Sequence, residues 1–157
     1  MNIFILDSDL KTNAKYYCDK HVVKMILESA QLLCTVVNLK GGVSPYKTTH
    51  INHPCTKWLM EDGSHWDMLV DLVKELNEEY KYRFNHEHNH KSFDVVMSLN
   101  KPKYDTNQFK GMFNSVTDEV RRTNIVDTIR LYREYYKDKF KTIDMKWTKR
   151  GCPDWMK

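Results

Sequence analysis

The sequence lacks the features that mark secreted, membrane-spanning and repetitive proteins. Its four cysteines, Cys18, Cys34, Cys55 and Cys152, include no closely spaced pair. We therefore interpret them as reduced thiols of an intracellular protein. The apolar N-terminal stretch MNIFILD is too short for a signal peptide or a membrane span, and no internal repeat or low-complexity tract occurs. We expect a water-soluble, cytoplasmic protein with no membrane partner.

The chain also carries little net charge. The 157 residues are 41% hydrophobic and 12% aromatic, which is enough for one compact domain with a substantial core. The net charge is only +4: residues 101–157 hold 14 Lys and Arg against 8 Asp and Glu, and residues 1–100 hold 11 against 13. The basic C-terminal third fits a polyanionic partner, although ordinary surfaces often carry such an excess.

Residues 16–38 contain neither glycine nor proline and are followed by Gly41 and Gly42, which predicts one long helix. Apolar or small side chains recur at helical spacing around most of this helix. They are Ala14, Cys18, Val22, Met25, Ser29, Leu32, Leu33 and Val36, extended by Ile26, Leu27, Ala30 and Val37. We expect the helix to be largely buried.

A narrow polar line interrupts this apolar surface: His21, Lys24, Glu28, Gln31 and Thr35. Polar groups on a buried helix need partners or must line a cavity. Two interpretations stay open. The line is either an ordinary Lys24/Glu28 pair on a partly solvated face or a catalytic or ligand-binding site.

The remaining sequence predicts further helices separated by irregular loops. Residues 2–6 form an apolar extended arm, and a second long helix ends at the His-rich residues 85–91. Capping and turn residues mark the helix starts: Asp7, Ser8 or Asp9, then Pro54, Ser64 with Asp67, Ser92, and Asn124 with Asp127. Residues 100–123 are expected to be irregular, and a tail with Trp147 and Trp155 to dock on the body. The expected fold is all-α, one domain over residues 1–157, with about three main helices and long irregular loops.

A second polar cluster precedes the helix that begins at Pro54. His50, Asn52 and His53 lie where free backbone N–H groups and the positive end of the helix dipole favour an anion such as phosphate. The alternative is an elaborate helix cap. Trp58 follows one turn later.

A zinc site is a third interpretation of these residues. Cys18 and His21 on the long helix, with His50, His53 and Cys55 on the loop, offer enough nitrogen and sulfur ligands for tetrahedral zinc. No CxxC pair is present, however, and Cys18 lies on the apolar face. We expect no zinc and no other cofactor.

Five stretches together resemble a group of small phage and bacterial proteins identified as pyrimidine dimer DNA glycosylases, which are distantly similar to the phage repair enzyme endonuclease V. These stretches are MNIF, CDKHVVKMILESAQLL, HINHPCTKW, EEYKYRF and LYREYY. The resemblance is strongest from residue 1 to about residue 84 and weaker around residues 124–140.

This resemblance implies an all-helical, cofactor-free enzyme that flips a nucleotide out of DNA and cleaves its glycosidic bond. In endonuclease V-like enzymes an N-terminal α-amine, exposed by removal of Met, attacks the sugar C1′, and a carboxylate on the first long helix stabilises the sugar cation. The chain departs from this pattern at Asn2, which is too large for efficient removal of Met1.

Three mechanisms are compatible with the departure at Asn2. The Met1 amine serves as nucleophile; or Lys24, buried near His21, forms the imine; or the protein is a monofunctional glycosylase in which Glu28 or Asp19 directs water. We prefer Glu28 over Asp19 because Glu28 shares the polar line with His21 and Lys24.

The predicted site therefore comprises catalytic, substrate-binding and DNA-backbone residues. The catalytic residues are Glu28, Lys24 and His21; the substrate-binding residues are His50, Asn52, His53, Gln31, Trp58 and Arg83; and the DNA-backbone residues are Arg130, Arg133, Lys149 and Arg150. DNA is the expected partner. Two further functions also fit this pocket: a non-catalytic binder of nucleotides or modified bases that counters host defence, and an enzyme acting on free nucleotides in base modification. The sequence assigns no oligomeric state.

Overall fold

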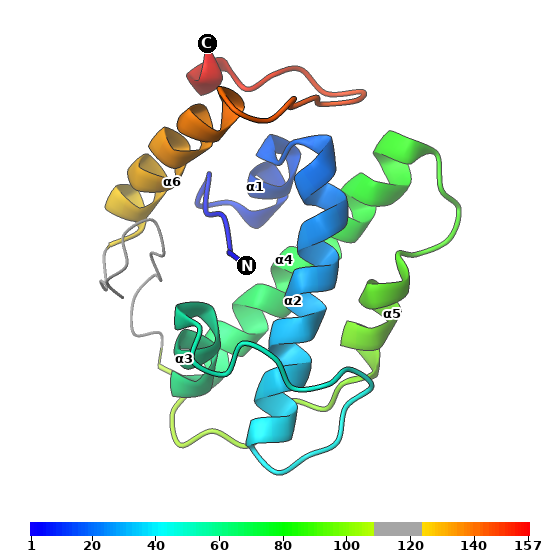
Figure 1. The fold of residues 1–157 in the computed structure, drawn as a ribbon, viewed down its shortest axis with the longest axis vertical. Coiled ribbons are helices and arrows are strands. Elements are labelled where there is room, and N and C mark those ends of the chain that lie inside the picture. The colour runs from blue at the N-terminus through cyan, green and yellow to red at the C-terminus, as the bar shows by residue number, and fades with distance from the viewer. Residues whose placement is uncertain (109–123) are drawn as a thin grey trace.

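The computed structural model describes residues 1–108 and 124–157. Within these ranges the regular structure is helical, without a strand (Figure 1). The elements are α1 (Leu10–Tyr16), α2 (Asp19–Leu39), α3 (Pro54–Glu61), α4 (Gly63–Phe84), α5 (Lys91–Ser98), α6 (Ile125–Phe140) and the 3-10 helix η1 (Asp154–Met156). The predicted all-α fold is confirmed. The expected number of about three main helices is too low, because short helices flank the long α2, α4 and α6.

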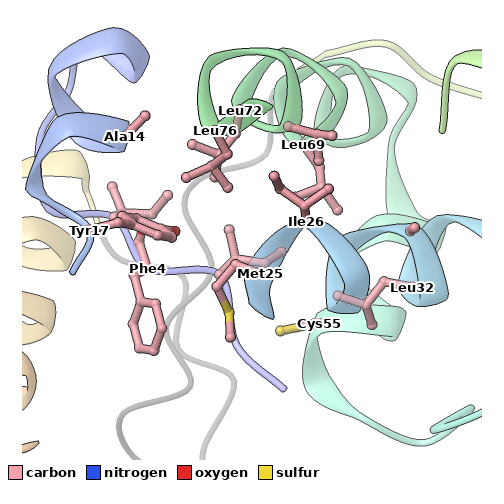
Figure 2. Close-up of a cluster of buried hydrophobic side chains, with 14 of the residues drawn as sticks. Phe4, Ala14, Tyr17, Met25, Ile26, Leu32, Cys55, Leu69, Leu72 and Leu76 are labelled. Atoms are coloured by element: carbon pink, nitrogen blue, oxygen red, sulfur yellow. The ribbon is translucent and has the colours of Figure 1, made fainter. Parts of the chain in front are cut away.

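The core lies between α2 and α4, with α3 and α5 also packed on α2 and α1 packed on α4. Figure 2 shows Met25 and Ile26 of α2 on the side that faces Leu69, Leu72 and Leu76 of α4. All five side chains are buried. Burial of a side chain of this size contributes about 1.5–3 kcal/mol, so the α2–α4 contact is a main source of stability.

Helix α2 is also long and apolar enough to cross a membrane, with a mean hydropathy of 1.5 over its most apolar window. Of that window, 67% is buried inside the protein. A core helix meets the same criterion, and its packing on three other helices accounts for its composition.

The predicted helix over residues 16–38 is wrong at its start. Helix α1 ends at Tyr16, and α2 begins at Asp19 after two residues in extended conformation. Side chains from other helices hydrogen-bond to the backbone of the two residues between α1 and α2. Tyr136 Oη accepts from the Cys18 N–H at 2.9 Å, and Arg83 Nη1 donates to the Tyr17 carbonyl at 2.7 Å. The expected burial of Leu27 is also wrong, since Leu27 is exposed.

The N-terminal segment before α1 is extended and buried, as predicted, yet it pairs with no strand in the described structure. Side chains from α1 and α6, and from the α1–α2 break, take the place of a strand partner. The Tyr17 hydroxyl donates to the Phe4 carbonyl at 2.7 Å, and Asn13 Oδ1 and Arg133 Nε bond the Leu6 N–H and carbonyl at 2.6 and 2.8 Å. Figure 1 shows this segment between α6 and α2, with the N-terminus beside the middle of α2.

Several predicted helix starts are confirmed and two are displaced. Asp9 caps α1, Pro54 is the first residue of α3, and Asn124 caps α6. Helix α4 is capped by Asp62 rather than Ser64, and α5 by His90 rather than Ser92. Both helices thus begin earlier than predicted, because a second polar residue two positions upstream accepts the first free N–H.

The C-terminal tail docks on the body as expected, since Trp147 is buried and its indole donates to the Tyr16 carbonyl at 2.9 Å. Trp155 lies against the rings of Tyr16 and Tyr136. Of the predicted irregular stretch, residues 100–108 form no helix, and residues 109–123 lie outside the described residues.

Candidate functional site

Two amines flank the carboxylate of Glu28 on the buried side of α2. Lys24 Nζ lies 3.4 Å from Glu28 Oε1, and the α-amine of Met1 lies 3.8 Å from Glu28 Oε2. The side chains of Glu28 and Met1 are only 12% and 4% exposed, whereas that of Lys24 is 65% exposed. The expectation that Lys24 is buried is therefore wrong, and of the two amine-bearing residues Met1 has the buried side chain.

Glu28 Oε2 is a buried acceptor that has no hydrogen-bond partner among the described residues. A separation of 3.8 Å brings the charges of Glu28 and Met1 together but is too long for a hydrogen bond. An unsatisfied buried polar group costs about 1–3 kcal/mol, and native proteins keep few of them outside functional sites. The carboxylate of Glu28 and the α-amine of Met1 therefore lie close together, and Oε2 keeps the capacity to accept a further hydrogen bond.

Two contacts hold Met1 in place, one through its side chain and one through the next residue. Its side chain packs against the hydrophobic core, and the next residue, Asn2, accepts a hydrogen bond from Tyr132 Oη at 2.8 Å. Chain ends are usually mobile unless they are tied down, so these contacts orient the α-amine. Helical spacing predicts Tyr132 on the buried face of the last helix, but its contact with Asn2 has no signal in the sequence.

His53 connects the second polar cluster to the N-terminus. Its Nδ1 accepts the Cys55 N–H at 3.1 Å as the cap of α3, and its imidazole also hydrogen-bonds to the backbone of Met1. Burial, and then the positive charges of the N-terminus and His50, lower the pKa of His53 below its ordinary value of 6.5. The imidazole is therefore neutral at pH 7. The nearby Cys55 thiol is protonated, since burial raises its pKa to about 12.

The loop before His53 is fixed by its own hydrogen bonds and by α2. Thr35, the last member of the polar line, exchanges two 3.1 Å bonds with the backbone of Thr49, and Thr56 Oγ1 donates to the His50 carbonyl at 2.9 Å. His50 is exposed, adopts a left-handed φ of 51°, and its ring centroid lies 6.2 Å from that of His53. Asn52 is exposed beside them. The loop thus presents polar side chains to solvent next to Met1.

The predicted line along α2 divides into two parts. His21 turns to α6, where its Nδ1 lies 2.7 Å from Tyr136 Oη and its ring stacks on Phe4. Burial is the largest cause that lowers the pKa of His21 to about 4, so its ring is neutral at pH 7 and shares a hydrogen bond with the Tyr136 hydroxyl. No contact of His21 with Glu28 is found in the described structure, and this position argues against a catalytic role. Gln31, one turn beyond Glu28, is half-buried.

Two of the predicted substrate-binding residues are inaccessible. Trp58 is buried, with its ring stacked on His65 at a centroid separation of 4.1 Å. Arg83 is fully buried in bonds to Glu79, Asp19 and backbone carbonyls. Neither side chain is accessible at the surface of the folded protein, and this burial argues against a direct contact with a substrate. One acidic partner of Arg83 is Asp19 of α2. Because this residue is distant in sequence, local patterns around Arg83 do not predict its burial.

The predicted DNA-backbone residues all have hydrogen-bond or ion-pair partners within the protein. Arg150 pairs with Glu79 at 2.7 Å, and Lys149 bonds the carbonyl of Tyr82 and the side chain of Asn85. On α6, Arg133 donates to the Leu6 carbonyl and also pairs with Asp7, and the exposed Arg130 pairs with Glu134. Most of these cations are neutralised within the protein.

The cysteines and histidines do not gather into a metal centre. Within residues 1–108 and 124–157, no three His, Cys, Asp or Glu side chains form a group suited to a metal ion. All four cysteines are free thiols.

Comparison with known proteins gives one family. The family described as pyrimidine dimer DNA glycosylase matches residues 1–92, which include Met1, Glu28 and the HINHP loop. No curated protein and no solved structure matches the chain.

Proposed function

The chain belongs to the pyrimidine dimer DNA glycosylase family, and we propose that it releases a damaged or modified pyrimidine from DNA, with the Met1 α-amine as nucleophile and Glu28 as the catalytic carboxylate. The observation that carries the proposal is the 3.8 Å approach of the Met1 α-amine to a buried carboxylate oxygen that has no hydrogen-bond partner among the described residues. Amines near neutral pH are effective nucleophiles toward sugar carbons when a carboxylate stabilises the developing cation.

The reaction proceeds by exchange of one bond at the sugar C1′. The amine nitrogen bonds to C1′ while the bond to the base breaks, and the base leaves with the electron pair and takes up a proton as the amine loses one. Opening of the sugar ring then gives an imine. Glu28 stabilises the positive charge on the sugar in the first step and accepts a proton later, when elimination of the 3′ phosphate cuts the strand.

Lys24 as nucleophile and Asp19 as the water-directing carboxylate are less well supported by the site. The Lys24 side chain is 65% exposed, so its amine is held less firmly than that of Met1, whose side chain packs against the core. Asp19 is bound to Arg83 and accepts hydrogen bonds from Thr148, which leaves it no free position for directing water.

His50 and Asn52 are the exposed polar groups of the loop beside the amine. Enzymes that act on a flipped base hold it by hydrogen bonds to its polar edge, and an imidazole and an amide can both supply such bonds. These two side chains are therefore suited to hold the flipped base.

The test is reductive trapping on duplex DNA that carries a thymine dimer or a modified pyrimidine. Borohydride reduces an imine to a stable adduct, and peptide mapping then names the amine. An adduct at Met1 supports the proposal, and an adduct at Lys24 moves the nucleophile there. Abasic sites without an adduct indicate water directed by Glu28. Neither product on any of these substrates would favour a nucleotide-binding protein or an enzyme acting on free nucleotides.

A pair of Asn2 variants makes the assignment sharper. Asn2→Ser places a small residue after Met1, so Met1 becomes removable and the new α-amine begins about 3.8 Å farther along the chain. Asn2→Gln loses the same Tyr132 contact but keeps a large residue, so Met1 is retained. We expect trapping to fall far more in Asn2→Ser than in Asn2→Gln, with intact mass confirming which terminus each protein carries.

A further inference from the structure

Three lysines gather beside the junction of α2 and α6. Lys20 and Lys24 lie one turn apart on α2, about 6 Å along its axis, and both are exposed. The contact between His21 and Tyr136, at 2.7 Å, joins α2 to α6 at this level. Lys139 follows Tyr136 by one turn on α6. We call Lys20, Lys24 and Lys139 the junction lysines.

The electrostatics of His21 give independent evidence that the three charges converge. After burial, the causes that lower its pKa are Lys139, Lys24 and Lys20. Each ammonium group therefore acts on the same point of the structure, although one of them comes from an element more than 100 residues away in sequence.

Fewer acidic side chains neutralise the junction lysines than neutralise Arg133 of α6 and Arg150 of the tail. Among the described residues, neither Lys20 nor Lys139 has an ion-pair partner, and the Lys139 ammonium lies over the Tyr135 ring at 5.1 Å. Lys24 shares Glu28 with the Met1 amine. By contrast, Arg150 and Arg133 are paired with Glu79 and Asp7.

We propose that the junction lysines bind the phosphodiester backbone of the DNA strand next to the nucleotide that enters the Glu28 site. Lys24 contacts that site directly, which makes the lysine cluster and the reacting centre continuous. Unpaired ammonium groups on an exposed surface bind phosphates by charge and release condensed counterions. The identification of the polyanion as DNA rests on the proposed function.

The test measures binding rather than base release. A fluorescent duplex with one thymine dimer, and the same duplex undamaged, are titrated by anisotropy over a series of salt concentrations. Lys20→Gln and Lys139→Gln are each expected to make the negative slope of log K against log salt shallower by about 0.9. If the variant and the wild-type protein bind equally at 1 M salt, the variant then binds about eightfold more weakly at 0.1 M salt. The double variant should change the slope by about twice as much.

Lys74→Gln is the matched control, because it removes the same charge from an exposed lysine of α4 that is already paired with Asp71. It should leave the slope unchanged, and Lys20→Arg should restore it. An equal loss in Lys74→Gln, no loss in Lys20→Gln and Lys139→Gln, or no binding of either duplex by the wild-type protein would overturn the assignment. A protein that binds as expected yet releases no base would refute the proposed function and leave this surface in place.

Discussion

Two buried carboxylates, one on each long core helix, have opposite surroundings. Glu79 of α4, 7% exposed, accepts from Arg83 Nε at 2.8 Å and from Arg150 Nε and Nη2 at 3.1 and 2.7 Å. Burial alone would raise the pKa of Glu79, but the hydrogen bonds from Arg150 and Arg83 outweigh it and hold the pKa below its ordinary value. Glu28 of α2 is nearly as buried, and its Oε2 accepts no hydrogen bond among the described residues.

We infer that the difference separates a structural centre at Glu79 from the proposed reactive centre at Glu28. Arg83 also bonds Asp19 and the carbonyls of Tyr17 and Lys15, so its cluster ties α4 to the start of α2, to the end of α1 and, through Arg150, to the tail. The carboxylate of Glu79 is thus saturated by protein donors, and a substrate could gain little by entering. At Glu28 the folded protein keeps a buried oxygen without a hydrogen-bond partner among the described residues, which lowers its stability. Such groups are typical of sites that act on a substrate.

Removal of the saturated centre should give the largest effect. Arg83→Met leaves Asp19 and several carbonyls without their donor, and we expect the free energy of unfolding to fall by about 3–5 kcal/mol. Urea unfolding measures this loss. A change below about 1 kcal/mol would contradict the structural role, and Arg83→Lys should recover only part of the loss because an ammonium cannot reproduce the planar set of donors.

At the reactive centre the same kind of change should affect activity and not stability. Glu28→Gln keeps the side-chain volume and removes the charge, so base release should fall by about 10²-fold or more while the free energy of unfolding changes by less than about 1 kcal/mol. Single-turnover base release and urea unfolding, measured on one preparation, separate the two quantities. Full turnover in the variant, or its failure to fold, would remove Glu28 from the mechanism.

The burial of His21 predicts that stability depends on pH over a range that lies mostly above the titration of the carboxylates. The pKa of His21 is lowered from 6.5 to about 4, so between these pH values the unfolded chain binds a proton that the folded protein does not. The free energy of unfolding should therefore rise with pH from about 4 to 6.5, by roughly 3 kcal/mol in total, and stay constant above that window. Denaturant unfolding across this range tests it.

His53 and His90 also have lowered pKa values, so they add to the same rise, and His21→Gln serves as the control. The variant should keep only the part that these two residues contribute. An unchanged pH profile in His21→Gln would show that the rise has another origin.

The exposed partner of Glu28 should have the smallest effect. Lys24 is 65% exposed, and such surface ion pairs contribute about 0–1 kcal/mol. Lys24→Met should therefore change the free energy of unfolding by no more than about 0.5 kcal/mol and leave borohydride trapping at Met1 intact. Loss of trapping as complete as in Glu28→Gln would instead make Lys24 the nucleophile.

Local patterns in the sequence determined much of the fold and part of the site. Helical spacing of apolar residues identified α2, α4 and α6, and the His53–Pro54 pair located the start of α3, because periodicity and capping depend on residues within a few positions of one another. The same reasoning selected Glu28 as a polar residue on a buried helix. Each of these predictions needed only short-range information.

Tertiary structure alone decided which groups meet. The α-amine of Met1 reaches Glu28, Arg83 reaches Asp19, and Lys139 joins Lys20 only because packing brings together segments that are distant in the chain. The break between α1 and α2 has the same origin, since its backbone groups are satisfied by Tyr136 and Arg83 and not by neighbours in sequence. A helical pattern encodes the face that a residue occupies, whereas the partner of that residue is set by long-range packing.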